Sequence, residues 1–370
     1  MKRPRVLLVS KAVAPPFHDG AICLVRDLCA GLNRCDATVM STAEAPAVPG
    51  AARHARIYAR RSGFSPALRD NVRVLAHLAA DRSHELWHFV FAPNPLSSRA
   101  GALLRRLRSV PIVQTVASRP LSFDRVQRLL FGDRVVTLSR HTADAFAAAG
   151  VPEQNLRVIP PPIADLARDA NAREAARRAA GVTRLGPLFV YPGDLEFSSG
   201  AGTVAAAIPA VLRDLPDATF VFACRAKTVR AQDVQRGLAQ ELRSFGDRVC
   251  FAGEVQDLPA LLASAAVVVF PVNDLYGKVD LPYAVLEACL LGVPVIVTTQ
   301  GPLAELRGAP QVAPGDAEAL AQQCVHLGRD AAWRDAIGQA LRGAVLGACS
   351  PRAVASAYED LYAELVAATT

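Results

Sequence analysis

The stretch that decides the fold runs from Lys278 to Glu305 and reads KVDLPYAVLEACLLGVPVIVTTQGPLAE. Its apolar middle is close to the roughly 20 residues that a membrane-spanning helix needs. Two prolines, a glycine and one acid interrupt that middle, however. We therefore predict a loop, a buried helix, a strand over Val293–Val297 and a glycine turn that opens a second helix. A helix followed by a strand in this order is typical of a parallel α/β sheet.

Two acids and a glycine turn in this stretch carry chemistry. Glu287 lies inside the apolar helix, where a charge is costly unless it has a partner, and Asp280 lies seven residues earlier. Thr299 and Gly301 follow the strand, and N–H groups at a helix start can bind an anion. An acid for hydroxyls beside amides for phosphate is what a sugar-nucleotide site requires. The alternative is that the stretch only builds the core of a parallel sheet.

Length and composition set the class of protein. A chain of 370 residues is large for one hydrophobic core, so we expect two domains. With 51% apolar and 20% charged residues, the chain should fold and be soluble. The first apolar run is too short for a signal peptide or an anchor. The eight cysteines form no CxxC pairs, which favours reduced cytoplasmic thiols and no metal site.

Charge divides the chain unequally. Residues 1–165 contain 23 Lys and Arg against 12 Asp and Glu, whereas residues 166–370 contain 18 against 22. The basic half indicates an anionic partner, either a membrane surface, an acidic acceptor or a nucleic acid. The chain has no zinc-finger spacing or RNA-binding aromatic motif, which argues against nucleic acid. The arginines of 53–73 and 99–108 are expected on amphipathic helices that suit an anionic membrane face, or else a solvated surface.

Strands and helices alternate along both halves, which predicts two Rossmann-like domains with parallel sheets. We expect domain 1 to cover residues 1–165 and domain 2 to cover 166–351, with a last helix over 352–370 that packs on either. Ligands should meet the carboxyl ends of the strands. The strands expected are Val6–Ser10, Ala37–Met40, Leu86–Phe91, Ile112–Thr115, Val135–Leu138, Arg157–Ile159, Leu188–Tyr191, Thr219–Ala223, Val249–Ala252, Val267–Phe270 and Val293–Val297.

Six segments in order resemble the retaining glycosyltransferases of glycosyltransferase family 4, which have the GT-B fold. They are RVLLVSKAVAPPFHDGAICLVRDL, VVTLSRHTADAFAAAGVPEQNLRVIPPPI, VYPGDLEFSSG, VCFAGEVQDLPALLASAAVVVFP, VLEACLLGVPVIVTTQGPLAE and APGDAEALAQ. The resemblance covers nearly the whole chain. It implies an α/β enzyme with two Rossmann-like domains facing a cleft. It further implies sugar transfer from a nucleotide-sugar donor, such as a UDP- or GDP-sugar, without a cofactor or a metal.

The resemblance also assigns roles to single residues. Glu287 matches the family acid that binds the ribose hydroxyls of the donor, and a carboxylate can accept two such hydrogen bonds. Gly20 matches the glycine loop of the first domain, where backbone approaches donor phosphates and acceptor. Gly301 and Thr299 match the donor-binding turn after the strand of the second domain. Val255 matches a position that packs near the base.

Departures from the family pattern concern the donor phosphates. Relatives carry Arg and Lys after the first strand of the second domain, where this chain has Gly193, Asp194 and, further on, Ser199. A leaving diphosphate needs positive charge, so other cations must supply it. We expect Arg225, Lys227 and Lys278 in this role. Asp280 stands one residue from the place of the first acid of the family motif, and its catalytic role requires a rearranged loop.

The acceptor side is less marked. Relatives have a histidine where this chain has Ala117 and Ser118, so Ser118 and Arg119 are expected to line the acceptor, together with His18, Asp19 and His88. The acceptor expected is a hydroxyl-bearing small molecule, glycan or lipid. The enzyme is expected in the cytoplasm, with peripheral contact to the inner membrane face. Two alternatives stay open, namely a phosphorylase-type enzyme that uses a simpler phosphate, and a non-catalytic sugar-binding homologue.

Overall fold

The computed structural model describes residues 3–15, 17, 19–51, 53–59, 67–166, 169–226 and 228–369. The chain forms two compact units. Unit 1 consists of Met1–Ala164, Tyr276–Leu281 and Ala348–Thr370, and unit 2 of Asp165–Leu275 and Pro282–Gly347. The sequence boundary near residue 165 agrees with the first crossing between units. The short segment Tyr276–Leu281 was expected in the second domain, but it belongs to unit 1.

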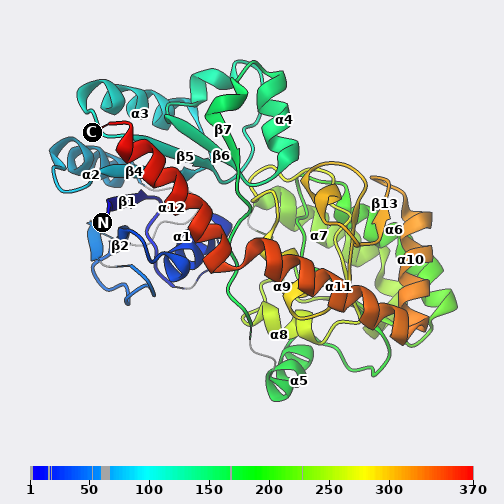
Figure 1. Cartoon of the computed structure of the whole chain (residues 1–370). Coiled ribbons are helices and arrows are strands. Elements are labelled where there is room, and N and C mark those ends of the chain that lie inside the picture. Colours follow the sequence, from blue (N-terminus) through cyan, green and yellow to red (C-terminus); the bar gives the residue numbers. More distant parts are fainter. Residues whose placement is uncertain are drawn as a thin grey trace. The chain divides into compact units, whose positions relative to one another are not determined.

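Unit 1 is built on one parallel sheet with the strand order β3-β2-β1-β4-β5-β6-β7. Helices cover the sheet (Figure 1). The strands are β1 (Arg5–Val9), β2 (Asp36–Thr42), β3 (Arg53–Tyr58), β4 (Leu86–Phe91), β5 (Ile112–Val116), β6 (Arg134–Thr137) and β7 (Leu156–Val158). The helices are α1 (Gly20–Gly31), α2 (Leu68–Ala80), α3 (Pro95–Leu107), α4 (Arg140–Ala148) and α12 (Pro351–Ala367).

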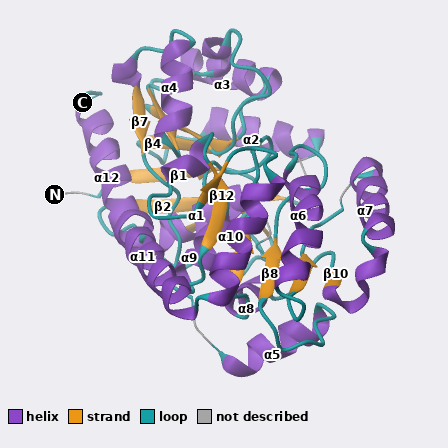
Figure 2. Cartoon of the chain, turned by 90° about the vertical axis from the view of Figure 1, so that its right-hand side faces the viewer, coloured by secondary structure: helices purple, strands orange, loops and turns teal. Residues whose placement is uncertain are grey.

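Unit 2 repeats the plan with the strand order β10-β9-β8-β11-β12-β13. Figure 2 shows its strands between helices. The strands are β8 (Leu188–Tyr191), β9 (Thr219–Phe222), β10 (Val249–Phe251), β11 (Val267–Val269), β12 (Val295–Thr298) and β13 (Gln311–Val312). The helices are α5 (Ala170–Ala179), α6 (Gly200–Asp214), α7 (Val229–Glu241), α8 (Leu258–Ala263), α9 (Tyr283–Leu290), α10 (Ala317–Arg329) and α11 (Ala331–Cys349). The prediction of parallel α/β sheets is confirmed for both units.

The stretch from Lys278 to Glu305 folds as its prolines and its glycine predict. The helix α9 is buried except at Ala284 and Glu287, and it ends two residues before Gly292, which has φ 74°. After Pro294 the chain forms β12, which is buried throughout and pairs in parallel with β11. In the described part of the chain, no helix is long and apolar enough to cross a membrane.

The arginine-rich stretch from Arg53 to Arg73 is the clearest failure of the sequence prediction. We expected one amphipathic helix, but Arg53–Tyr58 is the edge strand β3, paired in parallel with β2. Its side chains are mostly half-buried or exposed because only one edge has a partner strand, so the apolar alternation that marks a strand is weak. The helix α2 begins later, at Leu68. The two-residue strand β13 was missed for the same reason.

The C-terminal helix α12 belongs to unit 1, where it packs against α1 (Figure 1). A β-carbon added to Gly31 would stand 2.0 Å from the carbonyl oxygen of Pro351, so the two helices touch at a glycine. The buried carboxylate of Glu359 accepts the backbone N–H of Asn33 at 2.7 Å and that of Arg34. These contacts fix α12 to the end of α1.

Candidate functional site

In unit 2 the crossover direction changes between β8 and β11, because β9 and β10 extend the sheet on one side and β12 and β13 on the other. Ligands of open parallel sheets bind at the carboxyl ends of strands beside such a change. We call residues 192–199, which follow β8, the β8 loop. Its Ser199 donates from both the backbone N and Oγ to Asn273 Oδ1, at 3.0 and 3.2 Å. This pair joins the β8 loop to the loop after β11.

The β8 loop is organised around the carboxylate of Asp194. Its Oδ1 accepts the backbone N–H groups of Glu196, Phe197 and Ser198, at 2.9, 2.6 and 3.2 Å. Its Oδ2 accepts the hydroxyl of Ser198 at 3.1 Å. Successive N–H groups in a turn form a concave site for anions. Here the chain's own carboxylate occupies that position, so Asp194 shapes the loop from within.

Gly193 is required by packing beneath this loop. A β-carbon at Gly193 would lie 2.1 Å from the ring carbon Cζ of Tyr191 and 2.3 Å from its hydroxyl oxygen. The Tyr191 hydroxyl donates to the carbonyl of Asp194 at 2.7 Å, and burial raises its pKa well above the ordinary value. The glycine that the sequence placed in the donor site therefore also makes room for a buried tyrosine.

Glu287 is the only charged residue of α9, and it is half-buried on a helix whose other residues, Ala284 apart, are buried. The helix packs against β12. Because α9 connects β11 to β12, it starts at the carboxyl edge of the sheet. Glu287 therefore lies near the edge that ligands approach. Its position agrees with a carboxylate kept at a binding surface rather than sealed in a core.

The turn after β12 lies at the same edge. Thr299 is exposed, and its N–H donates to the carbonyl of Val312 at 2.9 Å. Gly301 has φ 76°, a left-handed conformation that favours glycine, and a short 3-10 helix over Pro302–Glu305 follows. A β-carbon at Gly301 would meet nothing within 4 Å, so this position is open.

Cations come from the loops after β9 and β11. The guanidinium of Arg225 is one-third exposed and lies 3.7 Å from a carboxylate oxygen of the more exposed Glu254. Such a surface pair contributes little, so a phosphate can compete with Glu254. Lys278 is half-buried, and Val255 is also half-buried. The expected donor residue Lys227 lies outside the described residues.

Asp280 lies in unit 1, on the segment Tyr276–Leu281. It is buried, and its Oδ2 accepts the hydroxyl of Ser139 at 2.6 Å. The same hydroxyl oxygen accepts the backbone N–H of Thr142 and so caps α4. Asp280 therefore fastens its segment to the start of α4. A part for Asp280 in the transfer step stays a prediction.

The equivalent change of direction in unit 1 lies between β1 and β4. The loop after β1, residues 10–19, contains an ion pair between Lys11 Nζ and Asp19 Oδ2 at 2.7 Å. Asp19 also accepts the backbone N–H of Ala21 at 2.9 Å and caps α1, which begins at Gly20. The expected acceptor residue His18 lies outside the described residues.

His88 does not fit the acceptor-side role that the sequence suggested. It is fully buried on β4, and its two ring nitrogens lie 2.7 Å from the hydroxyls of Tyr362 and Thr115. Burial lowers its pKa to about 3. Both nitrogens are already used within unit 1, so the expectation was wrong and His88 is a structural residue under α12.

Ser118 and Arg119 follow β5 at the carboxyl edge of the unit 1 sheet. Ser118 is buried and Arg119 half-buried. The guanidinium of Arg119 donates to the carbonyl of Pro120 at 2.9 Å and lies 5.5 Å from the ring centre of Tyr276. Besides the hydrogen bond of Asp280, this cation–π contact is a second contact that fixes the segment Tyr276–Leu281.

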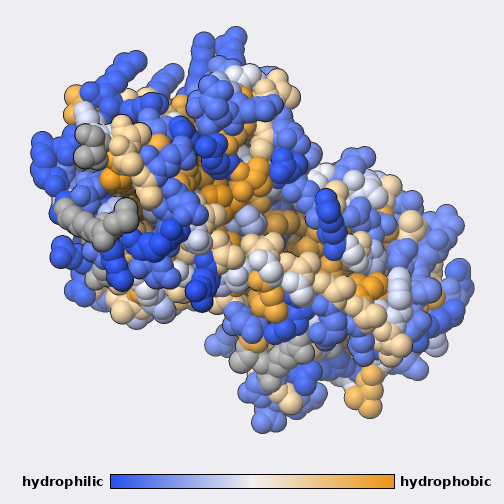
Figure 3. Space-filling view, in the orientation of Figure 1, coloured by the Kyte–Doolittle hydropathy of each residue, from blue (hydrophilic) through white to orange (hydrophobic). Residues whose placement is uncertain are grey.

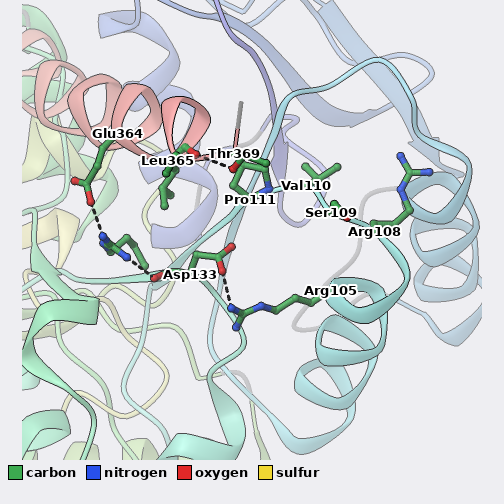
Figure 4. A pocket seen from close by; sticks show the side chains of 11 residues that line it. Arg105, Arg108, Ser109, Val110, Pro111, Asp133, Glu364, Leu365 and Thr369 are labelled. Carbon is green, nitrogen blue, oxygen red and sulfur yellow. Dashed lines mark hydrogen bonds and ion pairs between the residues drawn. The ribbon is translucent and has the colours of Figure 1, made fainter.

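Two hollows lie within the units. One of about 450 Å³ in unit 2 opens beside the β8 loop and α6, lined among others by Leu195, Ser198, Thr203 and Arg230. The other, of about 380 Å³ in unit 1, lies at the amino ends of β5 and β6 (Figure 4). There, Arg105 pairs with Asp133 at 2.6 Å and Arg134 with Glu364 at 2.5 Å, so most of its charge is balanced.

Among the described residues, no cluster of His, Cys, Asp or Glu could hold a metal ion.

Comparison with known proteins gives one family match and a shared fold. Residues 186–330 match the family model of glycosyl transferases group 1. The chain has the fold of GT-B glycosyltransferases, and this part of it resembles glycosyl transferases group 1. The match runs from the start of β8 to the end of α10 and so covers most of unit 2. No curated protein sequence matches the chain significantly.

Solved structures of GT-B glycosyltransferases match over the whole length. HepE from Anabaena, crystallised with UDP and glucose, is 18% identical with a TM-score of 0.75, over 98% of this chain and all of its own. Sucrose-phosphate synthase from Thermosynechococcus elongatus is 22% identical with a TM-score of 0.74, over 99% of this chain and all of its own. A glycosyltransferase from Rickettsia africae is 16% identical with a TM-score of 0.71, over 99% of each chain.

Sequence reasoning missed three residues that connect the site. Asn273 holds Ser199, as described above, and Thr228 donates its hydroxyl to Glu196 at 2.6 Å while capping α7. Each lies in a loop at the carboxyl end of a strand. Because such loops meet at one edge of a parallel sheet, polar residues in the loops after the strands are the signal that could have found them.

Proposed function

We propose that this glycosyltransferase moves a sugar from a nucleotide-sugar donor, a UDP-sugar before a GDP-sugar, to a hydroxyl acceptor with retention of configuration. The full-length likeness to HepE, which was crystallised with UDP, with UDP and glucose and with UDP-glucose, supports the choice of UDP. Donor binding is assigned to unit 2, which contains Glu287, the open turn at Gly301 and Arg225, with a further cation from Lys278 on the segment Tyr276–Leu281 of unit 1.

The observation that carries the proposal is the position of Glu287. It is the single charge on an apolar helix, and it is half-buried beside the strand whose end carries Gly301. A carboxylate there can accept two hydroxyl hydrogen bonds from a ribose. The donor diphosphate would then lie toward the Gly301 turn, where a helix start and an open backbone suit an anion.

The β8 loop constrains how the phosphates are neutralised. Asp194 brings a negative charge to the edge where the diphosphate is expected, so opposing cations are needed. We assign them to Arg225 and Lys278, with Lys227 as a third candidate. No metal is needed in this proposal, because guanidinium and ammonium groups carry the compensating charge.

In the transfer step, the bond between the sugar C1 and the donor phosphate oxygen breaks and a bond from C1 to the acceptor oxygen forms on the same face. The acceptor hydroxyl gives its proton to the leaving phosphate oxygen, so no protein nucleophile is required. Unit 1 is assigned to the acceptor through Asp19, Gly20, Ser118 and Arg119, with a cytoplasmic location and peripheral contact with the inner membrane face. The acceptor is a small molecule, glycan or lipid that bears a hydroxyl.

The first test is Glu287→Ala. A hydrogen bond to a charged group contributes roughly 1.5–3 kcal/mol, so kcat/KM for the accepted donor should fall about 10- to 100-fold. Affinity for UDP, measured by calorimetry, should fall in parallel, while the unfolding midpoint stays near that of the parent. Glu318→Ala, at an exposed acid of α10, is the matched control. Parent-like turnover in Glu287→Ala would remove this residue from the site.

One observation favours a second candidate. Because Asp194 fills the amide turn of the β8 loop, an enzyme of this fold that uses a simpler sugar phosphate, or a binding protein without activity, would need fewer phosphate contacts. Calorimetry separates the cases. Tight binding of UDP supports the nucleotide-sugar transferase, and binding of a sugar 1-phosphate without UDP supports the phosphorylase type. The absence of both, with no turnover over a donor panel, leaves a non-catalytic homologue.

A further inference from the structure

The six-residue segment Tyr276–Leu281 belongs to unit 1, although the chain up to Leu275 and again from Pro282 belongs to unit 2. The segment forms neither a helix nor a strand, so no regular ladder of hydrogen bonds determines its path. Two of its side chains are nevertheless buried, Val279 at 4% and Asp280 at 2% exposure. Side-chain contacts within unit 1 therefore have to define the conformation of this segment.

Near its end, the segment is held by a hydrogen bond between two buried side chains. Ser139, which is 2% exposed, donates its hydroxyl to Asp280 Oδ2 at 2.6 Å. A buried carboxylate is costly unless hydrogen bonds compensate it, so the Ser139 hydroxyl favours one position of the Asp280 side chain. The same hydroxyl oxygen accepts the backbone N–H of Thr142 at 3.1 Å, in the first turn of α4. Ser139 is therefore held by the helix and offers Asp280 a fixed donor.

At its start, the segment is held by an aromatic ring. The guanidinium of Arg119 lies 5.5 Å from the ring centre of Tyr276, and it also donates to the carbonyl of Pro120 at 2.9 Å. Lys278 is half-buried and lies midway between the two contacts, two residues from Tyr276 and two from Asp280. Contacts on both sides at this spacing leave the backbone of Lys278 little freedom.

We propose that Ser139 is a positioning residue for donor binding, which acts through Asp280 on the ammonium group of Lys278. This inference rests on the proposed function, in which Lys278 is one of the cations that neutralise the donor diphosphate. A cation on a backbone that is already ordered loses less conformational entropy when it meets the phosphates, so the donor binds more tightly. The Asp280 carboxylate then serves as the acceptor for Ser139, 141 residues away in the chain, and does not touch the sugar.

The first test is Ser139→Ala, with calorimetry of UDP and of uridine. UDP should bind about 5- to 10-fold more weakly, because Lys278 is no longer held in place, whereas uridine has no phosphate and should bind as it does to the parent. Ser139→Thr keeps a hydroxyl that can donate to Asp280 and cap α4, so its UDP affinity should stay within about twofold of that of the parent.

Loss of a helix cap also lowers stability, and this effect needs its own control. Asn94→Ala removes the cap of α3, where the Asn94 side chain accepts the backbone N–H of Ser97 at 3.0 Å. The unfolding midpoint should fall in Asn94→Ala as in Ser139→Ala, because either change removes one cap of unit 1. Only Ser139→Ala should lose affinity for UDP. An equal loss in Asn94→Ala would reduce the effect of Ser139 to general destabilisation and overturn the proposal.

The second test separates position from charge at Asp280. Asp280→Asn keeps an oxygen that accepts the Ser139 hydroxyl, so UDP affinity should stay within about twofold of that of the parent. Asp280→Ala removes the acceptor and should weaken UDP about 5- to 10-fold, as Ser139→Ala does. If the amide variant loses as much affinity as the alanine variant, the charge of Asp280 acts on the donor directly and the positioning role is refuted.

The third test asks whether the effect passes through Lys278. Lys278→Ala should itself weaken UDP about 5- to 10-fold, and Ser139→Ala/Lys278→Ala should weaken UDP no further, because the two residues act as one unit. Additive losses, or parent-like affinity in either single variant, would contradict the proposal. Loss of UDP affinity in Glu287→Ala with parent-like binding in Ser139→Ala would refute the positioning role alone. Failure of the parent to bind UDP would instead refute the proposed function.

Discussion

The loops after β1 and β8 hold equivalent places in the two sheets, yet each uses its acid differently. In unit 1, Asp19 caps α1 and pairs with Lys11, so the loop balances its own charge. In unit 2, Asp194 accepts three backbone N–H groups and one hydroxyl, all of them neutral donors. The two loops share a fold position but differ in net charge. In the proposed mechanism, the donor side therefore depends on cations from neighbouring loops, and the acceptor side does not.

The largest effect should come from removing the carboxylate that holds the β8 loop. Asp194→Ala takes away the acceptor of three backbone N–H groups, and we expect the free energy of unfolding to fall by about 2 kcal/mol. Asp194→Asn keeps an acceptor oxygen and should cost less than about 1 kcal/mol. Urea denaturation checks both.

The amide variant also tests the charge of the loop. Asp194→Asn removes a negative charge near the expected diphosphate, so UDP should bind several-fold tighter, on the order of 3- to 10-fold. Unchanged UDP affinity would mean that Asp194 is too far from the phosphates to act on them, and the contrast between the two loops would lose its functional meaning.

A smaller effect is expected from replacing Arg225, the cation proposed to offset the negative charge of Asp194. Arg225→Gln should weaken UDP about fivefold to tenfold while uridine binds as before, because only the diphosphate meets the guanidinium. Calorimetry with both ligands checks this. Arg173→Gln, at an exposed arginine of α5, is the matched control. Equal weakening of both ligands would place the phosphate contact elsewhere.

The smallest effect concerns unit 1. Burial alone would raise the pKa of the Asp19 carboxyl, but the charge and hydrogen bond of Lys11 and the N–H groups of Ala21 and Ile22 outweigh it, so the pKa is lowered. The stability from Asp19 is therefore full at neutral pH and is lost as the pH falls below the ordinary value of 3.8. A double-mutant cycle of Lys11→Gln and Asp19→Asn should give a coupling of about 1 kcal/mol at pH 7.

The cycle is repeated in acid, where the coupling should shrink toward zero as Asp19 takes up a proton. A coupling that persists at low pH would show that the pair is not held by charge. The comparison with Asp194 would then rest on hydrogen bonds in both loops.

The sequence predicts most of the architecture because buried parallel strands are continuous apolar runs, such as those that became β8 and β12. It misses β3, because an edge strand half-exposed to solvent lacks that run. The sequence gives no sign that the six-residue segment with Asp280 belongs to unit 1, because no local pattern records which unit such a segment will join.

For the site, position was predictable and orientation was not. The resemblance to family 4 indicated positions for Glu287, Asp194 and Gly301 after strands of the second domain. It gave no sign that Asp194 turns into its own loop, because that depends on the hydrogen-bond geometry of residues 196–198. His88 was expected to line the acceptor, but the hydroxyl of Tyr362, 274 residues away in the chain, bonds to its ring.

The dependence of the first sheet on α12 has a consequence for synthesis on the ribosome. The partners of His88 and of the amides at Asn33 and Arg34 are Tyr362 and Glu359, which are among the last residues to be made. While the nascent chain lacks them, a buried histidine and two amides of unit 1 are without their native partners. Unit 2 is contiguous apart from six residues, so we expect it to gain protease resistance earlier than unit 1, although it is translated later.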